Sequence, residues 1–396
     1  MKFVMNIFVV VIVLLASLTP IKSYAEEIGT EPSVHSEAAI VFEASTGSIL
    51  FEKNSNAKMY PASLTKIATA IYAIEKGNLD DIVTVSKKAR EVDGTRVYLE
   101  EGEQVPLKKL IQGLLINSGN DAGVAIAEHL EGSVEDFSDK LNQYLEEVIG
   151  VENTHFENPH GLFSENHFST AHDLALITQY ALKNSVFTEI FGTKELEWNG
   201  VSWKTTLYNH HLLLREIPYE GIIGGKNGYV EQSRHTLSTA AERGALTLIA
   251  VVLKADKDQV YDDTVELLDY GFTNFEITEV TAPQTFSNKE DSKYLLKEPV
   301  KYIRKKNESV RLEVNHDGFL VIQGEDGRFI KNIKLKESKP KEQSKTEPIQ
   351  EKPSVQKNSS SNFKLLLLLI PFILIIIAFL FRKKIKGIKN TISRFD

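Results

Sequence analysis

The sequence predicts a mixed α/β (α+β) fold, in which one sheet is built from both ends of a large domain and is covered by helices. Three observations indicate it. Strand-like apolar segments come first, helical periodicity dominates the middle, and strand-like segments return near residue 221 before a last helix. Because a sheet must bury its apolar face against another layer, this order favours a sheet closed by both termini of the domain, with helices packed around it.

Residues 38–54 (AAIVFEASTGSILFEKN) predict the first hairpin, because apolar runs flank a Ser-Thr-Gly turn. Residues 62–76 predict a helix that ends at Gly77, a residue type that commonly follows the last helical turn. The apolar side chains of this segment recur on one helical face: Leu64, Ile67, Ala68, Ile71 and Ile74.

The middle of the chain predicts helices, and the part after it predicts strands. Residues 105–117 and 121–131 form two helical patterns joined at Ser118-Gly119-Asn120, and residues 172–183 form another. Three β-like segments follow between residues 221 and 255: GIIGGKNGYV, HTLSTAAER and ALTLIAVVLKA. The segment DTVELLDYGF then predicts the closing helix.

These elements make up a predicted domain over residues 30–274. Residues 275–336 alternate polar and apolar side chains around DGF and EDGRF turns, which predicts a small C-terminal all-β domain. Residues 337–362 are rich in Lys, Glu, Ser, Gln and Pro, with almost nothing to bury. Such a segment cannot offset its ordering entropy, so a disordered linker is expected there.

Both ends of the chain carry membrane-related patterns. Residues 1–25 are typical of a secretory signal peptide, with Lys2, an apolar core and the cleavage-like Ser23-Tyr24-Ala25; an uncleaved anchor is the alternative. Residues 363–381 predict one transmembrane helix, built on a 17-residue apolar run. Residues 382–396 predict a short basic tail, and clustered cations favour the cytoplasmic side. We therefore expect a single-pass protein of the cell membrane with its folded part outside.

Charge and composition exclude several classes of function. The net charge is −8, and the part between the signal and the transmembrane segment carries −16. Nucleic-acid binding requires clustered cations, so no nucleic-acid partner is expected. The chain has no cysteine, which removes disulfides, thiolate catalysis and cysteine metal sites. We expect no cofactor and no metal site.

Five Ser-x-x-Lys pairs occur in the sequence: Ser55/Lys58, Ser63/Lys66, Ser338/Lys341, Ser354/Lys357 and Ser361/Lys364. Only Ser63 opens an apolar periodic helix. A serine there lies among free backbone N–H groups at the positive end of the helix dipole, where developing negative charge is stabilised. Lys66 lies on the same helix face, within reach of the Ser63 hydroxyl. For an isolated pair, the simpler interpretation is that Ser63 caps the helix and Lys66 is solvated.

Two further elements change that interpretation. Ser118-Gly119-Asn120 lies at a helix junction, and Lys226-Asn227-Gly228 lies on a predicted strand. Either alone is ordinary turn chemistry. In this order, the three elements match the signature of serine enzymes that react with penicillin.

The chain resembles low-molecular-mass penicillin-binding proteins with D-alanyl-D-alanine carboxypeptidase activity from about Ala38 to Phe272. The stretches that carry the resemblance are YPASLTKIATAIYAIE, GLLINSGNDAGVAIAEHL, NPHGL, STAHDLALI and DTVELLDYGF. The resemblance implies an antiparallel sheet flanked by helices, with an all-helical lobe. It also implies removal of the terminal D-alanine from peptidoglycan stem pentapeptides, and β-lactam antibiotics as covalent inhibitors.

The roles expected at the site follow from this chemistry. Ser63 attacks the carbonyl, and Lys66 removes the proton of the Ser63 hydroxyl, which requires that the pKa of Lys66 be depressed. Repulsion from Lys226 is expected to lower this pKa, and burial is expected to lower it further. Ser118 relays protons. The substrate-binding residues are Asn120, Lys226, Asn227, Gly228 and Tyr229, and by family analogy the backbone N–H groups of Ser63 and Tyr229 hold the oxyanion.

Asn227 departs from the family pattern, which has Thr or Ser at this position to donate to the substrate carboxylate. The alternatives are therefore a penicillin-binding but poorly catalytic cell-wall scaffold, and a β-lactamase-like hydrolase. A phosphate-binding loop is excluded by the spacing of Gly221 and Gly225 and by Asn227 after the lysine. A zinc hydrolase built on His155, His160, His167 and His172 lacks the usual ligand spacing.

Overall fold

The computed structural model describes residues 30–338. The predicted signal peptide, transmembrane helix and basic tail lie outside the described residues, as does nearly all of the predicted linker. Among residues 30–338, no helix is long and apolar enough to cross a membrane.

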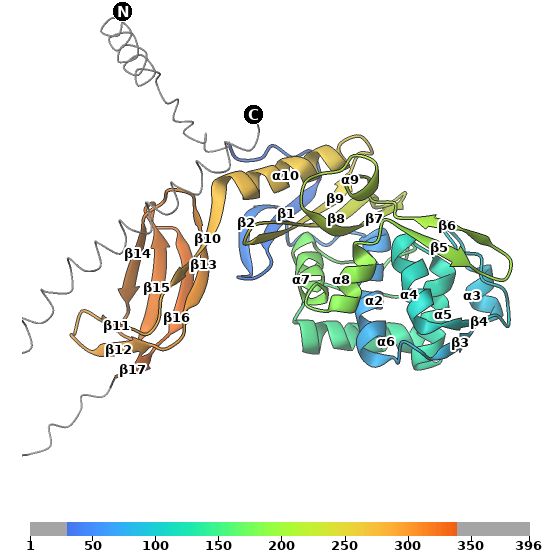
Figure 1. The fold of residues 1–396 in the computed structure, drawn as a ribbon, viewed down its shortest axis with the longest axis horizontal. Helices are drawn as coiled ribbons and strands as arrows, with labels where there is room; N and C mark the ends of the chain where they lie inside the picture. The colour runs from blue at the N-terminus through green and yellow to red at the C-terminus, as the bar shows by residue number, and fades with distance from the viewer. Residues whose placement is uncertain (1–29, 339–396) are drawn as a thin grey trace, which may run out of the picture. The chain divides into compact units, whose positions relative to one another are not determined.

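The centre of the domain predicted over residues 30–274 is a five-stranded antiparallel sheet with the order β2-β1-β9-β8-β7 (Figure 1). Its strands are β1 (Ala38–Glu43), β2 (Ser48–Lys53), β7 (Ile222–Val230), β8 (Arg234–Arg243) and β9 (Leu246–Ala255). Strand β1 pairs with β9 along its whole length, from Ala38 opposite Leu253 to Glu43 opposite Leu248. The predicted closure of the sheet by both ends of the domain is confirmed, and so is its antiparallel pairing.

Both faces of this sheet are buried, which explains why β1 is an unbroken apolar run. Ala38, Ile40 and Phe42 lie in the core shared with the helical lobe. Ala39 and Val41 lie in a second core, shared with α10 (Val260–Asn274). The alternation follows from strand geometry, in which successive side chains point to opposite faces. Figure 1 shows α10 on one side of the sheet and the helical lobe on the other.

The helical lobe contains the elements that position the candidate site. They are η1 (Ala62–Leu64), α2 (Thr65–Lys76), α3 (Lys87–Glu91), α4 (Leu107–Ile116), α5 (Asn120–Glu131), α6 (Val134–Tyr144), η2 (Leu145–Ile149), α7 (Ala171–Ala181) and α8 (Ser185–Phe191). The helical lobe implied by the resemblance is present, but it is not all-helical, because the short strands β3 (Ile82–Thr84) and β4 (Gln104–Pro106) pair within it. The helix predicted over residues 105–117 begins only at Leu107, because β4 pairs with β3 and buries Val105.

Several short elements had no clear signal in the sequence. The hairpin of β5 (Glu195–Asn199) and β6 (Lys204–Tyr208) covers one end of the lobe, and its Trp198 is buried. The four-residue helix α9 (Leu212–Arg215) leads into β7. Helix α6 has its hydrophobic face against α5 and α2, although its sequence is mostly polar.

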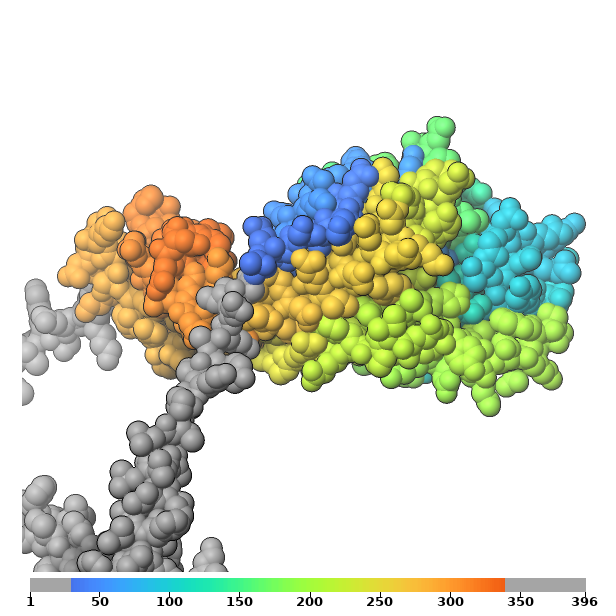
Figure 2. All heavy atoms as spheres, turned by 90° about the horizontal axis from the view of Figure 1, so that it is seen from above, coloured from blue at the N-terminus to red at the C-terminus, as the bar shows by residue number. Residues whose placement is uncertain are grey.

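The start of the described chain is fixed to α10. Backbone N–H groups of Ser33, His35 and Ser36 donate to the carboxylates of Glu266 and Asp263. Figure 2 shows this N-terminal region, in blue, lying beside α10 in yellow. The contact stabilises the buried carboxylate of Asp263, because the backbone N–H groups of His35 and Ser36 donate to its two oxygens.

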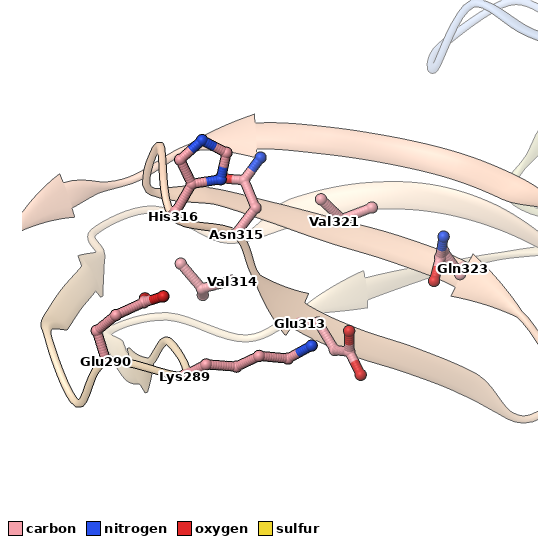
Figure 3. A pocket seen from close by; sticks show the side chains of 8 residues that line it. All are labelled: Lys289, Glu290, Glu313, Val314, Asn315, His316, Val321 and Gln323. Atoms are coloured by element: carbon pink, nitrogen blue, oxygen red, sulfur yellow. The ribbon is translucent and has the colours of Figure 1, made fainter.

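After α10 the described chain is all β, which agrees with the predicted small β region. Its strands are β10 (Phe275–Val280), β11 (Gln284–Ser287), β12 (Lys293–Leu296), β13 (Val300–Lys305), β14 (Val310–Val314), β15 (Phe319–Gly324), β16 (Phe329–Lys334) and β17 (Lys336–Glu337). A separate apolar core includes Val280, Tyr302 and Ile322. A cavity of about 310 Å³ lies here, lined from the β11–β12 turn and from β14 and β15, and none of the predicted site residues lines it. Figure 3 shows the side chains that line it.

Candidate active site

The backbone around Ser63 is held in an unusual conformation by contacts on two sides. Ala62, directly before the serine, has φ +49°, and such positions cost about 1–3 kcal/mol and collect at functional sites. A Cβ added to Gly161 would lie 1.8 Å from the Ala62 carbonyl oxygen, and one added to Gly228 would lie 2.7 Å from the Ser63 nitrogen. Two glycines therefore let a loop and strand β7 approach the backbone of Ser63 closely.

Lys66 lies one turn after Ser63, on the buried face of α2, and only 1% of it is exposed. Its Nζ is 2.8 Å from Ser63 Oγ, 3.0 Å from Ser118 Oγ and 2.8 Å from Asn120 Oδ1. A neutral amine has two N–H donors and one lone pair. It can donate to Ser118 and Asn120 and accept the hydroxyl proton of Ser63, so the three contacts suit a general base.

Ser118 and Asn120 come from the sharp junction between α4 and α5. Ser118 has φ +61°, and its Oγ lies 3.2 Å from Ser63 Oγ. The Asn120 backbone N–H donates to the Thr95 carbonyl at 2.7 Å, and its Nδ2 donates to the Asp93 carbonyl at 2.7 Å. These bonds fix the amide so that its oxygen faces Lys66. The sequence-predicted pair is thus brought to the serine by a strained turn.

Lys226 approaches from β7, the edge strand of the sheet, and is 2% exposed. Burial lowers the pKa of Lys226 to about 7. Burial also lowers the pKa of Lys66 well below its usual range, and the charge of Lys226 lowers it further. The sequence argument gave the larger share to repulsion; desolvation is the larger cause, because Lys66 lies inside the protein rather than in a solvated cleft.

Asn227 and Tyr229 lie beside Lys226 with part of their surface free. Lys226 Nζ donates to the Asn227 carbonyl at 2.8 Å and lies 3.4 Å from Asn227 Oδ1. This turns the amide oxygen toward the lysine and leaves the amide N–H groups available for a ligand. Tyr229 is 60% exposed and its ring lies 4.7 Å from that of His235. Lys226-Asn227-Gly228 is on a strand, as predicted, and is not a hairpin tip.

The described geometry thus joins a serine, a buried lysine, a second serine and a second lysine from three separate parts of the chain. The family of D-alanyl-D-alanine carboxypeptidases, peptidase S11, matches residues 25–257. The chain belongs to this family.

Curated relatives and solved structures agree with the family assignment. D-alanyl-D-alanine carboxypeptidase DacF of Bacillus subtilis is 34% identical over 319 residues, which is 78% of each chain. D-alanyl-D-alanine carboxypeptidase DacC of Escherichia coli is 35% identical over 276 residues, which is 66% of this chain and 68% of the relative. The structure of penicillin binding protein 5 from Haemophilus influenzae superposes with a TM-score of 0.68 at 26% identity, covering 78% of this chain and 98% of that one.

Three of the four histidines that could have suggested a zinc site have their own polar partners in this S11 fold. His167 Nε2 lies 2.8 Å from Thr65 Oγ1, and its Nδ1 accepts from the Glu157 N–H. His155 Nδ1 lies 3.0 Å from the Asn166 carbonyl, and His172 lies 3.6 Å from Asp173. Among residues 30–338, no group of three or more His, Asp or Glu side chains could hold a metal ion.

His160 and His210 belong to the surroundings of the site but were not predicted as site residues. His160 is 6% exposed, and burial together with the charge of Lys66 holds its pKa well below the usual range. It lies in the NPHGL stretch, which the sequence analysis used only for the resemblance. Burial, with the charges of Lys226 and Lys66, lowers the pKa of His210 to about 4. Nothing in the sequence around His210 marks it as close to the two lysines.

Proposed function

We propose that this D-alanyl-D-alanine carboxypeptidase works through an acyl-enzyme on Ser63 and releases the terminal D-alanine of peptidoglycan stem pentapeptides. One observation carries the assignment of the nucleophile. Lys66, buried and with a depressed pKa, lies 2.8 Å from the hydroxyl oxygen of Ser63. A neutral lysine at this distance can take the hydroxyl proton as the serine attacks.

Acylation then proceeds by proton transfers between groups already in contact. Ser63 Oγ bonds to the penultimate D-alanine carbonyl carbon while its proton passes to Lys66. The carbonyl oxygen becomes an oxyanion, for which the N–H groups of Ser63 and Tyr229 are the proposed donors. Ser118 Oγ, 3.0 Å from Lys66 Nζ, can pass the proton to the departing nitrogen of D-alanine. The C–N bond breaks, and free D-alanine leaves an ester on Ser63.

Deacylation uses the same base. A water molecule gives its proton to Lys66 as its oxygen attacks the ester carbonyl, and the proton returns to Ser63 Oγ when the ester bond breaks. The products are the shortened peptide and the free serine. A β-lactam follows only the first half of this path. Ser63 opens the four-membered ring, the amine of the opened ring stays attached to the acyl group, and the β-lactam therefore remains bound as a covalent inhibitor.

Lys226, Asn227 and Asn120 are the proposed substrate-binding groups. Lys226 and the free N–H groups of Asn227 face the position of the C-terminal carboxylate. The Asn120 amide, held by Asp93, is available to the substrate amide. Charge-assisted hydrogen bonds of this kind are the strong ones, so the carboxylate is the main recognition feature of the substrate.

The proposed location is the outer face of the cell membrane, with a single C-terminal anchor and a short cytoplasmic tail. The support is the sequence pattern at residues 363–381 and 382–396, and the position of the wall substrate, which an enzyme of this family must reach. The polar linker would let the folded part stand away from the membrane.

The experiment that tests the function combines labelling with turnover. Purified protein is first treated with a fluorescent penicillin and then supplied with a peptide ending in D-Ala-D-Ala, and D-alanine release is measured. We expect both a label and turnover. A label without turnover indicates the penicillin-binding scaffold, whereas rapid release of hydrolysed penicillin indicates a β-lactamase-like hydrolase.

A further inference from the structure

The loop of residues 92–103 connects α3 to β4 and is bonded to the α4–α5 junction of the candidate site. The Thr95 carbonyl accepts from the Asn120 N–H at 2.7 Å. The next carbonyl, that of Arg96, accepts from Asn117 Nδ2 at 3.0 Å. The side chain of Arg96 therefore starts from a backbone position that is fixed directly against the junction that carries Asn120.

A buried carboxylate holds the same loop from the inside. Both oxygens of Asp121 lie 3.0 Å from the Val97 nitrogen, and Oδ2 also accepts from the Leu99 N–H at 3.1 Å. Tyr98, between these two donors, has φ +57° and is 50% exposed. Its ring lies 5.0 Å from that of Trp203 in the β5–β6 turn. The loop thus has a defined conformation, with Tyr98 packed against the hairpin.

A cavity of about 350 Å³ lies at this loop. Its lining comes from α3, from the loop and from the β5–β6 turn, and includes Arg96, Tyr98 and Ser202. The Ser202 hydroxyl donates to the Tyr98 carbonyl at 2.8 Å, which joins the hairpin to the loop. This volume is at the lower end for small-ligand sites, so it suits an amino-acid side chain rather than a folded partner.

One of the two arginines that line the cavity has no anionic partner. Arg90 Nε pairs with Glu100 at 2.8 Å, and Glu91, the other acidic residue of the lining, lies 3.9 Å from the Lys87 ammonium. Arg96 Nε is buried without a hydrogen-bond partner, and no carboxylate of the described chain forms an ion pair with this guanidinium. Each acidic side chain of the lining thus has a cation, and Arg96 is the cation left over.

The free donors of Arg96 lie along one edge of the guanidinium. Nη1 already donates to the Arg90 carbonyl at 3.3 Å, so Nε and Nη2 remain. In a planar guanidinium these two N–H groups can bind both oxygens of one carboxylate, which is a strong, charge-assisted arrangement. A buried donor without an acceptor is unfavourable, and a carboxylate bound in the cavity would supply the missing acceptor.

We propose that Arg96 and the cavity form a specificity subsite for a carboxylate that the stem peptide carries upstream of the cleaved bond. This inference rests on the function proposed above. An extended peptide advances at most about 3.6 Å per residue, so a residue one or two positions before the cleaved pair stays within roughly 7 Å of the substrate amide at Asn120. A loop in direct contact with Asn120 is placed to meet such a residue. Arg96 recognises the charge of the stem and takes no part in bond breaking.

The test uses three synthetic pentapeptides as competitors of Ser63 labelling by a fluorescent penicillin. The first, L-Ala-γ-D-Glu-L-Lys-D-Ala-D-Ala, has a free carboxylate at its second residue. The second peptide has meso-diaminopimelate, and hence a carboxylate, at its third residue and an amide at its second. The third peptide has the amide and the lysine, and carries only the C-terminal carboxylate. The peptide concentration that halves the labelling rate is measured for wild type and Arg96→Gln.

We expect Arg96→Gln to raise this concentration roughly 10- to 100-fold for an acidic peptide, as for the loss of one charge-assisted bond. Whether the first or the second peptide responds shows which stem residue carries the carboxylate. The third peptide should give nearly equal values with both proteins. Arg96→Lys, which keeps the charge but not the paired donors, should recover part of the loss. Arg311→Gln, at an exposed position of β14, is the matched control and should change none of the values.

Two results overturn the proposal. An equal change for all three peptides indicates that Arg96 only supports the loop around Asn120, and unchanged values for both acidic peptides exclude the subsite. The competition does not depend on peptide turnover. A wild-type protein that is labelled but releases no D-alanine therefore contradicts the proposed function, while the charge selectivity of Arg96 is still decided by the competition values.

Discussion

Lys66 Nζ lies 2.8 Å from Ser63 Oγ, and the residue that carries it is 1% exposed. A lysine in such a position is costly to the fold as long as it carries its charge. Its neutral form is at the same time the form that can accept the serine proton. The stability of the fold and the reactivity of Ser63 thus both depend on one buried amine.

The first prediction concerns the nucleophile. Benzylpenicillin should form one adduct, on Ser63, because this serine contacts the buried Lys66 of its own Ser-x-x-Lys pair from the start of the helix. Peptide mapping by mass spectrometry locates the adduct. Ser63→Ala should abolish it, while Ser55→Ala, the same change in another Ser-x-x-Lys pair, should leave it intact. An adduct on Ser55 or Ser118 would contradict the assignment.

The second prediction concerns the stability of the protein against pH. The pKa of Lys226 falls to about 7 on folding, so below pH 7 the fold carries the full cost of a buried cation. The cost declines as pH rises toward the unfolded value near 10.5. Lys226→Met should therefore raise the free energy of unfolding by a few kcal/mol at pH 6, and by little near pH 10.

Urea unfolding at both pH values measures this difference. Lys140→Met, a change of the same kind at an exposed position, should give no pH-dependent gain. The Lys226→Met protein should also lose carboxypeptidase activity at every pH. A variant that is less stable than wild type at pH 6 would show that the lysine is a net stabiliser of the fold.

The third prediction concerns Asn227. Asn227→Thr should raise kcat/KM for peptides ending in D-Ala-D-Ala, because a compact hydroxyl can donate a shorter bond to the carboxylate, worth up to a few kcal/mol. Stability should not fall, since strands favour Thr over Asn. Asn227→Ala serves as the control that removes the donor. If Thr lowers kcat/KM as Ala does, the pocket is built around the amide, and Asn227 is a specificity element.

The fourth prediction concerns the loop that supports Ser63. Gly161→Ala should destabilise the protein by several kcal/mol and slow acylation, because the new methyl group would lie 1.8 Å from the Ala62 carbonyl oxygen. Gly132→Ala is the matched control: its φ is +83° against +86°, but nothing lies within 4 Å. It should cost only the conformational penalty of about 1–2 kcal/mol. Equal losses of stability in the two variants would contradict the steric explanation.

The fifth prediction concerns topology. Protease added to intact cells should cut within residues 337–362 and release a soluble, active head, since that segment is polar and follows the last described strand. Digestion of the C-terminal tail by external protease, with the head protected, would reverse the proposed orientation. N-terminal sequencing of the released head tests cleavage of the signal after Ala25.

The sequence predicted the elements that repeat a simple pattern. The hairpin of β1 and β2, the helix of Lys66 and the strand of Lys226 were found because apolar periodicity and turn residues act locally. The three catalytic elements were found because their residue types are unusual in combination. That Lys66, Ser118 and Lys226 converge follows only from the family resemblance, since no local pattern fixes distances across the fold.

The features of the site that the sequence did not predict depend on contacts between distant segments. His210 stands in an undistinguished His-His pair, and its backbone position is determined by Asn209 and His211 binding residues elsewhere. Ala62 has its positive φ where Thr236 from β8 donates to the Pro61 carbonyl and where the loop of Gly161 approaches the Ala62 carbonyl. The sequence alone placed repulsion by Lys226 before burial as the cause that lowers the pKa of Lys66. This order was wrong, because the burial of a side chain can be judged only when the chain is folded.

The pairing of β1 with β9 joins segments about two hundred residues apart in the chain. During synthesis β1 emerges first and must remain without its central partner until β9 has followed. Closing so long a loop carries an entropic cost before any native contact repays it, and topologies of this kind fold slowly. Strand β7, with Lys226, is completed in the same late stretch. A truncated chain that ends before residue 246 should therefore keep its nucleophile and yet have no sheet on which to present it.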